Sequence, residues 1–194
     1  AFGEHLKSNG FEVEEFERGA LGGEDERLDQ VSQGLLEVSL SDVRAAGSID
    51  GTIMAMRLPF FLEDMDQLDR AMLEGGMLEK INQGTTPSGV RVLDTVSVGS
   101  AAGILNTIKP ITNMSDMVGL RMRALDQVQI ALYEAWGTQG TIVAWDEVPN
   151  ALQTGVANGY LNTPIVPIMF GHTSFLNHFT DAKITLSSRV VLVS

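Results

Sequence analysis

The chain has 194 residues, of which 44% are hydrophobic and 20% charged, and its formal net charge is -12. This length and composition suffice for a buried core and argue against disorder. The acidic balance and the lack of a basic stripe argue against a nucleic-acid partner, and the absence of cysteine excludes disulfides, thiolate nucleophiles and thiolate metal sites.

The first elements predict an α/β fold. Apolar and acidic residues alternate at 11–16, which predicts a half-exposed strand. A glycine turn at 21–23 is followed by helical spacing over 28–35 and by a second apolar strand at 36–40. Strand, helix and strand in this order favour a βαβ unit and a largely parallel sheet.

The middle of the chain predicts a longer helix and a crossing segment. Apolar residues along one side of 66–81 predict one continuous helix, and 89–98 predicts a strand. The Gly- and Ala-rich stretch 97–108 is expected to cross between lobes. Ser115 and Asp116 are expected to cap a short helical turn.

The second half continues the alternation of strands and helices. The expected elements are a strand at 119–123, a helix at 127–136, a strand at 141–143, and a helix at 147–154 with Asp146 as its N-cap. No apolar run approaches the roughly 18 residues that span a bilayer, so we expect a chain that is not itself embedded in a membrane.

The two ends suggest a processed or shortened chain. The sequence opens without an initiator Met, which we expect of a mature product whose signal peptide has been removed. Residues 189–194 read as a buried strand with nothing after it. Because a domain rarely stops on an unprotected apolar strand, we expect further sequence at the C-terminus.

Several short motifs follow one another along the chain. They are Gly-Ala-Leu-Gly-Gly-Glu at 19–24, Leu-Pro-Phe at 58–60, Asp-Met-Val-Gly-Leu-Arg-Met-Arg at 116–123 and Glu-Val-Pro-Asn-Ala-Leu-Gln-Thr-Gly-Val-Ala-Asn-Gly at 147–159, with Asn162 and Pro164 after the last. In this order they resemble the turn, the LPF element, the D-x-x-G-x-K/R-x-R strand and the E-V-Y-x-A-L-Q-x-G-x-x-D-G helix of DctP-type solute-binding subunits of TRAP transporters. The resemblance covers nearly the whole chain.

The resemblance implies a two-lobed α/β fold like that of periplasmic binding proteins, with a ligand cleft between the lobes and an apparent truncation at the C-terminus. Lobe I would comprise 1–97 with 187–194 returning to it, and lobe II would comprise 98–186. It also implies a monomer in the periplasm that captures a small organic acid, a carboxylate, by lobe closure. The acid would be delivered to TRAP membrane permease subunits without catalysis, cofactor or metal.

The resemblance also implies a set of ligand-binding residues. Arg123 matches the family's carboxylate-binding arginine, and its planar, permanently charged fork suits a carboxylate. Asn162 would donate an amide hydrogen bond, Trp145 would form an apolar wall, and Phe60 with Phe61 would line the other lobe. Arg121 is a rival anchor because alternate residues of a strand share one face.

Other positions depart from the family pattern and leave the acid undefined. Gly103 stands where many members have another arginine and is expected to leave room in the pocket. Pro149 replaces a tyrosine, Asn158 an aspartate and Ile184 a histidine. Gly103 and Trp145 together favour a monocarboxylate with an apolar or ring-containing body.

Residue chemistry leaves alternatives open. Without the resemblance, Arg123 is more typical of a surface or salt-bridging arginine than of a ligand anchor, and Asn162 is equally typical of a turn residue ahead of Pro164. A ligand-sensing domain of the same fold serving a receptor fits the motifs too. A carboxylate-dependent hydrolase or isomerase would have to use Asp146 and Glu147, but adjacent helical residues do not face one another. The sequence also has no G-x-S-x-G, P-loop or H-E-x-x-H motif.

Overall fold

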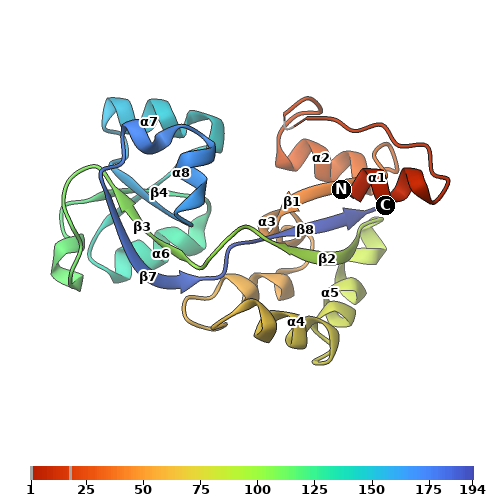
Figure 1. The fold of residues 1–194 in the computed structure, drawn as a ribbon. Helices are drawn as coiled ribbons and strands as arrows, with labels where there is room; N and C mark the ends of the chain where they lie inside the picture. Colours follow the sequence, from red (N-terminus) through yellow and green to blue (C-terminus); the bar gives the residue numbers. More distant parts are fainter. Residues whose placement is uncertain (1, 18) are drawn as a thin grey trace.

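The computed structural model describes residues 2–17 and 19–194, and these form two sheets joined by crossing segments (Figure 1). The three-stranded sheet has the order β1-β8-β2, formed by Val38–Asp42, Ser188–Val193 and Arg91–Ser97. The five-stranded sheet has the order β5-β4-β6-β3-β7, formed by Gln139–Ile142, Arg121–Ala124, Gly159–Asn162, Ala102–Asn106 and His178–Thr185. We call each sheet with its helices the three-stranded half and the five-stranded half.

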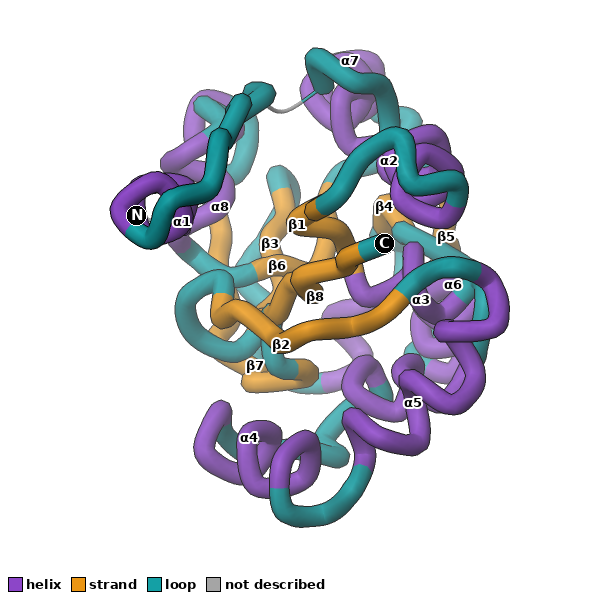
Figure 2. The backbone as a smooth tube through the Cα atoms, turned by 90° about the vertical axis from the view of Figure 1, so that its right-hand side faces the viewer, coloured by secondary structure: helices purple, strands orange, loops and turns teal. Residues whose placement is uncertain are grey.

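Helices surround both sheets (Figure 2). Those of the three-stranded half are α1 (Phe2–Ser8), α2 (Glu24–Ser32), α3 (Val43–Gly47), the 3-10 helix η1 (Gly51–Arg57), α4 (Met65–Leu73), α5 (Met77–Thr85) and η2 (Thr86–Ser88). Those of the five-stranded half are η3 (Met114–Met117), α6 (Gln127–Ala135), η4 (Trp145–Glu147), α7 (Val148–Thr154), α8 (Ile165–Met169) and η5 (His172–Ser174). None of the described helices is long and apolar enough to cross a bilayer.

Each half has its own hydrophobic core. In the three-stranded half, Ile53 and Leu68 are fully buried against the sheet residue Val190. In the five-stranded half, Met122 and Tyr133 are fully buried in a separate cluster. Burying one such side chain contributes about 1.5–3 kcal/mol, so each half has apolar packing of its own.

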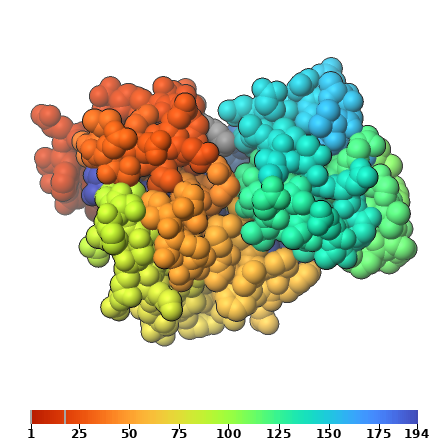
Figure 3. Space-filling model, turned by 180° about the vertical axis from the view of Figure 1, so that it is seen from behind, coloured from red at the N-terminus to blue at the C-terminus, as the bar shows by residue number. Residues whose placement is uncertain are grey.

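Two segments connect the halves, and both run through the middle of the molecule (Figure 1). One joins β2 to β3 and lies within the predicted crossing stretch 97–108; the other joins β7 to β8. They are tied together by a hydrogen bond of 2.8 Å from the Val98 N–H to the Ser187 carbonyl. From behind, residues around 45–60 abut residues around 125–135, so the halves also meet directly (Figure 3).

The predicted strand at 11–16 and the βαβ unit are wrong. Residues 11–17 have no regular structure, and Phe11 and Phe16 are exposed. β1 instead pairs antiparallel with β8, as β2 does. Among the described strands, the parallel pairs are β4–β5 and β4–β6, and the other pairs are antiparallel. A segment with an alternating pattern forms a strand only where a neighbouring strand can hydrogen-bond to it. The neighbour of β1 is β8, which is distant in the sequence.

Three predictions of helix limits are also wrong. The helix expected at 66–81 is two helices, because Gly76 adopts φ 71° and interrupts it after Gly75. A positive φ suits glycine and cannot continue a right-handed helix. Glu147, not Asp146, is the N-cap of α7. Asn113, not Ser115, is the N-cap of the turn at Met114–Met117, but Asp116 takes part in the cap as predicted, because its carboxylate accepts from the Asn113 N–H at 3.0 Å. The strands near 89–98, 119–123 and 189–194 and the helix at 127–136 are confirmed.

Candidate functional site

Arg123 is a buried cation with a free donor. It lies on β4 with only 5% of its surface exposed. Its Nε donates to the Val143 carbonyl at 2.9 Å, but its Nη2 has no hydrogen-bond partner among the described residues. Burial lowers the pKa of this guanidinium below its usual range, although an arginine remains charged at neutral pH. An unpaired buried donor with a positive charge is costly unless an anion meets it.

The sheet topology brings three predicted site residues to one edge. β4 lies between β5 and β6 and is parallel to both. Arg123 is near the carboxyl end of β4, Trp145 follows the end of β5, and Asn162 ends β6. Open α/β sheets bind ligands beyond the carboxyl ends of their parallel strands. The fold therefore gathers residues that are distant in sequence at the edge where a ligand is expected.

Trp145 joins Arg123 to an aromatic cluster. The Arg123 guanidinium carbon lies 5.4 Å from the Trp145 ring centroid, close enough for a cation–π contact. The indole also meets Tyr160 and Phe170 edge-on, at centroid distances of 5.7 and 5.3 Å. A hollow of about 190 Å³ lies beside it, lined by Trp145, Asp146, Pro149, Phe170 and His172. These contacts fix the indole next to the charged group.

The side-chain amide of Asn162 forms a hydrogen bond through its oxygen. Its Oδ1 accepts a 2.9 Å hydrogen bond from the Thr163 N–H, which is the turn role expected before Pro164. No bond from its Nδ2 to another described residue is present, so that donor remains for another group. Asn162 lies opposite Gly103 in the β3–β6 pairing.

The expectation that Gly103 leaves room in the pocket is wrong. A Cβ at this position would collide with the Thr180 carbonyl and the Phe179 ring of β7. Glycine suits this position because β7 is paired with β3 and approaches it closely. The direction in which a side chain would leave position 103 is therefore occupied by the neighbouring strand.

The other three predicted residues, Arg121, Phe60 and Phe61, lie apart from this edge, and Phe61 is exposed. Arg121 is exposed, and its Nε donates to the Gly155 carbonyl at 2.8 Å, at the C-terminal end of α7. Phe60 is 64% exposed with φ 59°, and its N–H donates to the Ile184 carbonyl at 2.7 Å. A bulky residue with positive φ is uncommon and holds backbone strain. Phe60 thus fastens the three-stranded half to the end of β7.

Sequence reasoning missed an ion-pair cluster between the halves. Arg57, at the end of η1, places its Nη1 3.0 Å from Oδ2 of Asp126 and 3.3 Å from Oδ1 of Asp42. Asp126 is the N-cap of α6, and Asp42 is the N-cap of α3. The cap positions were readable from the sequence, but no spacing pattern links Arg57 to Asp126.

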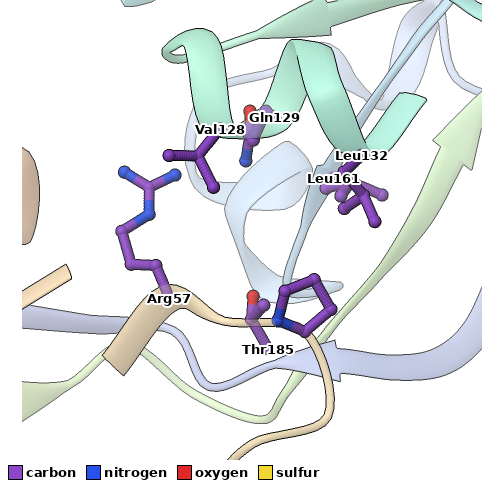
Figure 4. A pocket seen from close by; sticks show the side chains of 7 residues that line it. Arg57, Val128, Gln129, Leu132, Leu161 and Thr185 are labelled. Carbon is purple, nitrogen blue, oxygen red and sulfur yellow. The ribbon is translucent and has the colours of Figure 1, made fainter. Parts of the chain in front are cut away.

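A narrow crevice lies beside Arg57 (Figure 4). It is lined by residues from both halves, namely Arg57, Pro59, Val128, Gln129, Leu132, Leu161 and Thr185. Its volume of about 20 Å³ is close to the minimum that holds one water. The crevice is a closed contact between the halves and has no space for an organic ligand.

His172 supplies a pH-dependent contribution to stability. It is 2% exposed, and its Nδ1 lies 3.1 Å from the Tyr160 hydroxyl. Burial lowers its pKa below the ordinary 6.5. Between the folded and unfolded pKa values, His172 binds a proton in the unfolded chain but not in the folded chain. The free energy of unfolding therefore falls as the pH falls through 6.5 toward the pKa of the folded protein. We expect the melting temperature to drop from about pH 7.5 to 5.5, and less so in His172→Asn. Equal drops in both proteins would contradict this role.

The chain matches a family model. Residues 5–194 match the family described as "Bacterial extracellular solute-binding protein, family 7". The ectoine/5-hydroxyectoine-binding periplasmic protein UehA of Ruegeria pomeroyi is 27% identical over 187 residues, which cover 93% of this chain and 52% of UehA. The chain spans about half the length of the curated relatives that it matches first.

Solved structures share the fold. A TRAP periplasmic solute-binding protein from Roseobacter denitrificans, with bound β-D-glucuronate, superposes with a TM-score of 0.89 at 23% identity, over 99% of this chain and 64% of the other. One from Sulfitobacter sp. NAS-14.1, with bound β-D-galacturonate, has a TM-score of 0.89 at 21% identity, over 100% and 65%. The mixed α/β architecture with two sheets is therefore that of TRAP solute-binding proteins.

Proposed function

Because the chain belongs to family 7 of the bacterial extracellular solute-binding proteins, we propose that it captures a small organic acid in the periplasm and delivers it to the membrane permease of a TRAP transporter. The two lobes are 1–97 with 187–194, and 98–186. The separate hydrophobic cores of the two halves support this division. The crossing segments between β2 and β3 and between β7 and β8 act as the hinge of lobe closure.

The observation that carries this proposal is the unpaired Nη2 of Arg123. A carboxylate meeting this buried guanidinium would satisfy the donor and neutralise the charge together. One charge-assisted hydrogen bond contributes about 1.5–3 kcal/mol, whereas micromolar affinity needs about 8 kcal/mol. Arg123 alone is therefore insufficient. The Asn162 amide and the face of Trp145 supply further contacts at the same edge of the sheet.

The substrate class follows from what surrounds the cation. Trp145 offers an apolar face beside Arg123, and the relatives named above bind ring compounds with one carboxylate: ectoine, glucuronate and galacturonate. Position 103 is a glycine, and the place of its Cβ is occupied by the Thr180 carbonyl and the Phe179 ring, so this position offers no second cation to a dicarboxylate. A monocarboxylate with a ring-containing body is the ligand that this arrangement favours.

A thermal-shift screen tests the function. The panel is D-glucuronate, D-galacturonate, ectoine and succinate, with glucuronamide as the uncharged match of glucuronate. A compound that binds only the folded state raises the melting temperature by mass action. We expect a shift with at least one ring monocarboxylate and none with glucuronamide or succinate. Equal shifts with glucuronate and glucuronamide would contradict the carboxylate anchor, and a folded protein that responds to no member would contradict the proposed class.

A further inference from the structure

Arg57 connects acids from both halves of the molecule. Its Nη1 is 3.0 Å from Asp126 in the five-stranded half and 3.3 Å from Asp42 in the three-stranded half. The side chains of Arg57 and Asp126 are only 14% and 13% exposed, and that of Asp42 is 23% exposed. Charges that are shielded from water in this way interact more strongly than surface pairs. The Arg57–Asp126 pair therefore exists only while the halves are in contact, whereas the Arg57–Asp42 pair lies within one half.

Asp42 and Asp126 both interact electrostatically with Arg123. Asp126 follows Arg123 closely in the link from β4 to α6. The pKa of Arg123 is lowered chiefly by burial; Tyr133, Asp42 and Asp126 oppose this shift, and Arg57 adds to it. Arg57, Arg123, Asp42 and Asp126 thus influence one another electrostatically, although among the described residues it is Arg57 that forms the ion pairs with the two acids. Arg57 hydrogen-bonds Asp42 and forms an ion pair with Asp126. Arg123 Nη2 and Asp126 Oδ2 each lack a hydrogen-bond partner among the residues that the structure describes.

We propose that Arg57 is a positioning residue that keeps Arg123 available to the carboxylate of the ligand by holding Asp42 and Asp126, an inference that rests on the proposed role of Arg123 as an anion anchor. Without Arg57 the two acids lose the cation that pairs with both of them, and Arg123 together with the two acids has a net charge of one negative unit. An incoming anion then meets repulsion in place of attraction. Because Arg57 and Asp126 belong to different halves, this release of Arg123 is coupled to lobe closure.

The effect of Arg57 on Arg123 can be measured without knowing the ligand, because the Trp145 ring lies beside the Arg123 guanidinium and its fluorescence can be followed. The chain has two tryptophans, so Trp136→Phe leaves Trp145 as the only fluorophore of its kind. Iodide, an anion, and acrylamide, which is neutral, quench its fluorescence according to their local concentrations. In this background we expect Arg57→Gln to lower the iodide quenching constant about twofold and to leave acrylamide quenching unchanged.

A charge-balancing variant separates positioning from structure. Asp126→Asn removes one negative charge but retains an oxygen that can accept from the Gln129 N–H, as Asp126 does at 3.0 Å. We expect Arg57→Gln/Asp126→Asn to recover the iodide quenching of the parent. Arg91→Gln is the matched control, because it removes one charge at the Val193 end of β8, whereas Asp42 pairs at the Arg189 end. It should leave quenching by both agents unchanged.

Other results would overturn the proposal. Increased quenching of Arg57→Gln by both agents would mean that Arg57 only keeps the halves together. Failure of the double variant to recover would contradict the role of charge. Arg123→Gln in the same background separates the two proposals. If it lowers iodide quenching and Arg57→Gln does not, only the inference about Arg57 fails; if Arg123→Gln has no effect, the anion anchor fails as well.

Discussion

Arg123→Met is expected to weaken D-glucuronate binding on the order of 100-fold or more while leaving the melting temperature equal to or above that of the parent protein. A bidentate pair comprises two charge-assisted hydrogen bonds, each contributing about 1.5–3 kcal/mol, and every 1.4 kcal/mol is about tenfold in affinity. Methionine keeps an unbranched, flexible side chain in the buried position. Isothermal titration calorimetry measures the loss of binding.

The stability half of this prediction follows from the unpaired Nη2. Arg123 is 5% exposed and lacks a partner there among the described residues. Replacing an uncompensated buried charge by an apolar side chain of similar length is neutral or stabilising, and the lost Nε bond to Val143 offsets about 1 kcal/mol of the gain. Arg121→Met on the same strand is the control, and it should bind glucuronate normally. A clear fall in the melting temperature of Arg123→Met would show that the guanidinium is already compensated.

Trp145→Ala is expected to lower both stability and selectivity. The indole contacts Arg123, Tyr160, Phe170 and His172 at one point of the fold. Losing these contacts from a half-buried position costs about 2 kcal/mol of unfolding free energy. Affinity for ring-containing D-glucuronate should fall on the order of tenfold, and affinity for the smaller, acyclic acid D-erythronate should fall less. Chemical denaturation and calorimetry measure the two effects.

Trp136→Ala provides the matched control for the selective wall. Trp136 is also half-buried, but it packs on Tyr133 at a centroid distance of 6.1 Å, on α6. Its loss should lower stability without changing the ratio of the two affinities. An equal loss of glucuronate and erythronate binding in Trp145→Ala would contradict the selective wall, even if the fold were weakened as expected.

The sequence alone predicted the elements that local chemistry specifies. The helix at 127–136 was predictable because its apolar spacing and polar start act within a few residues. The strand at 189–194 was predictable because a continuous apolar run cannot remain exposed. The two-lobed family assignment came from short motifs in a fixed order, and the arginine at position 123 was named on the same basis.

Local patterns failed where a distant partner decides the outcome. Residues 11–16 alternate like a strand, yet β1 obtains its hydrogen bonds from β8 at the other end of the chain. Gly103 suggested an open pocket, but β7 fills that space with Phe179. In both places the sequence did not show which distant segment would lie beside the residues in question.

The sequence therefore predicted several of the helical and extended segments and the residue types that are able to bind an acid. Only the tertiary structure showed that Arg123 is buried without a partner at Nη2 among the described residues, and that Arg57 holds Asp42 and Asp126. The physical reason is that burial and charge pairing depend on contacts between segments far apart in the chain. Such contacts leave no local period in the sequence, because each residue of the pair is chosen by its partner and not by its neighbours.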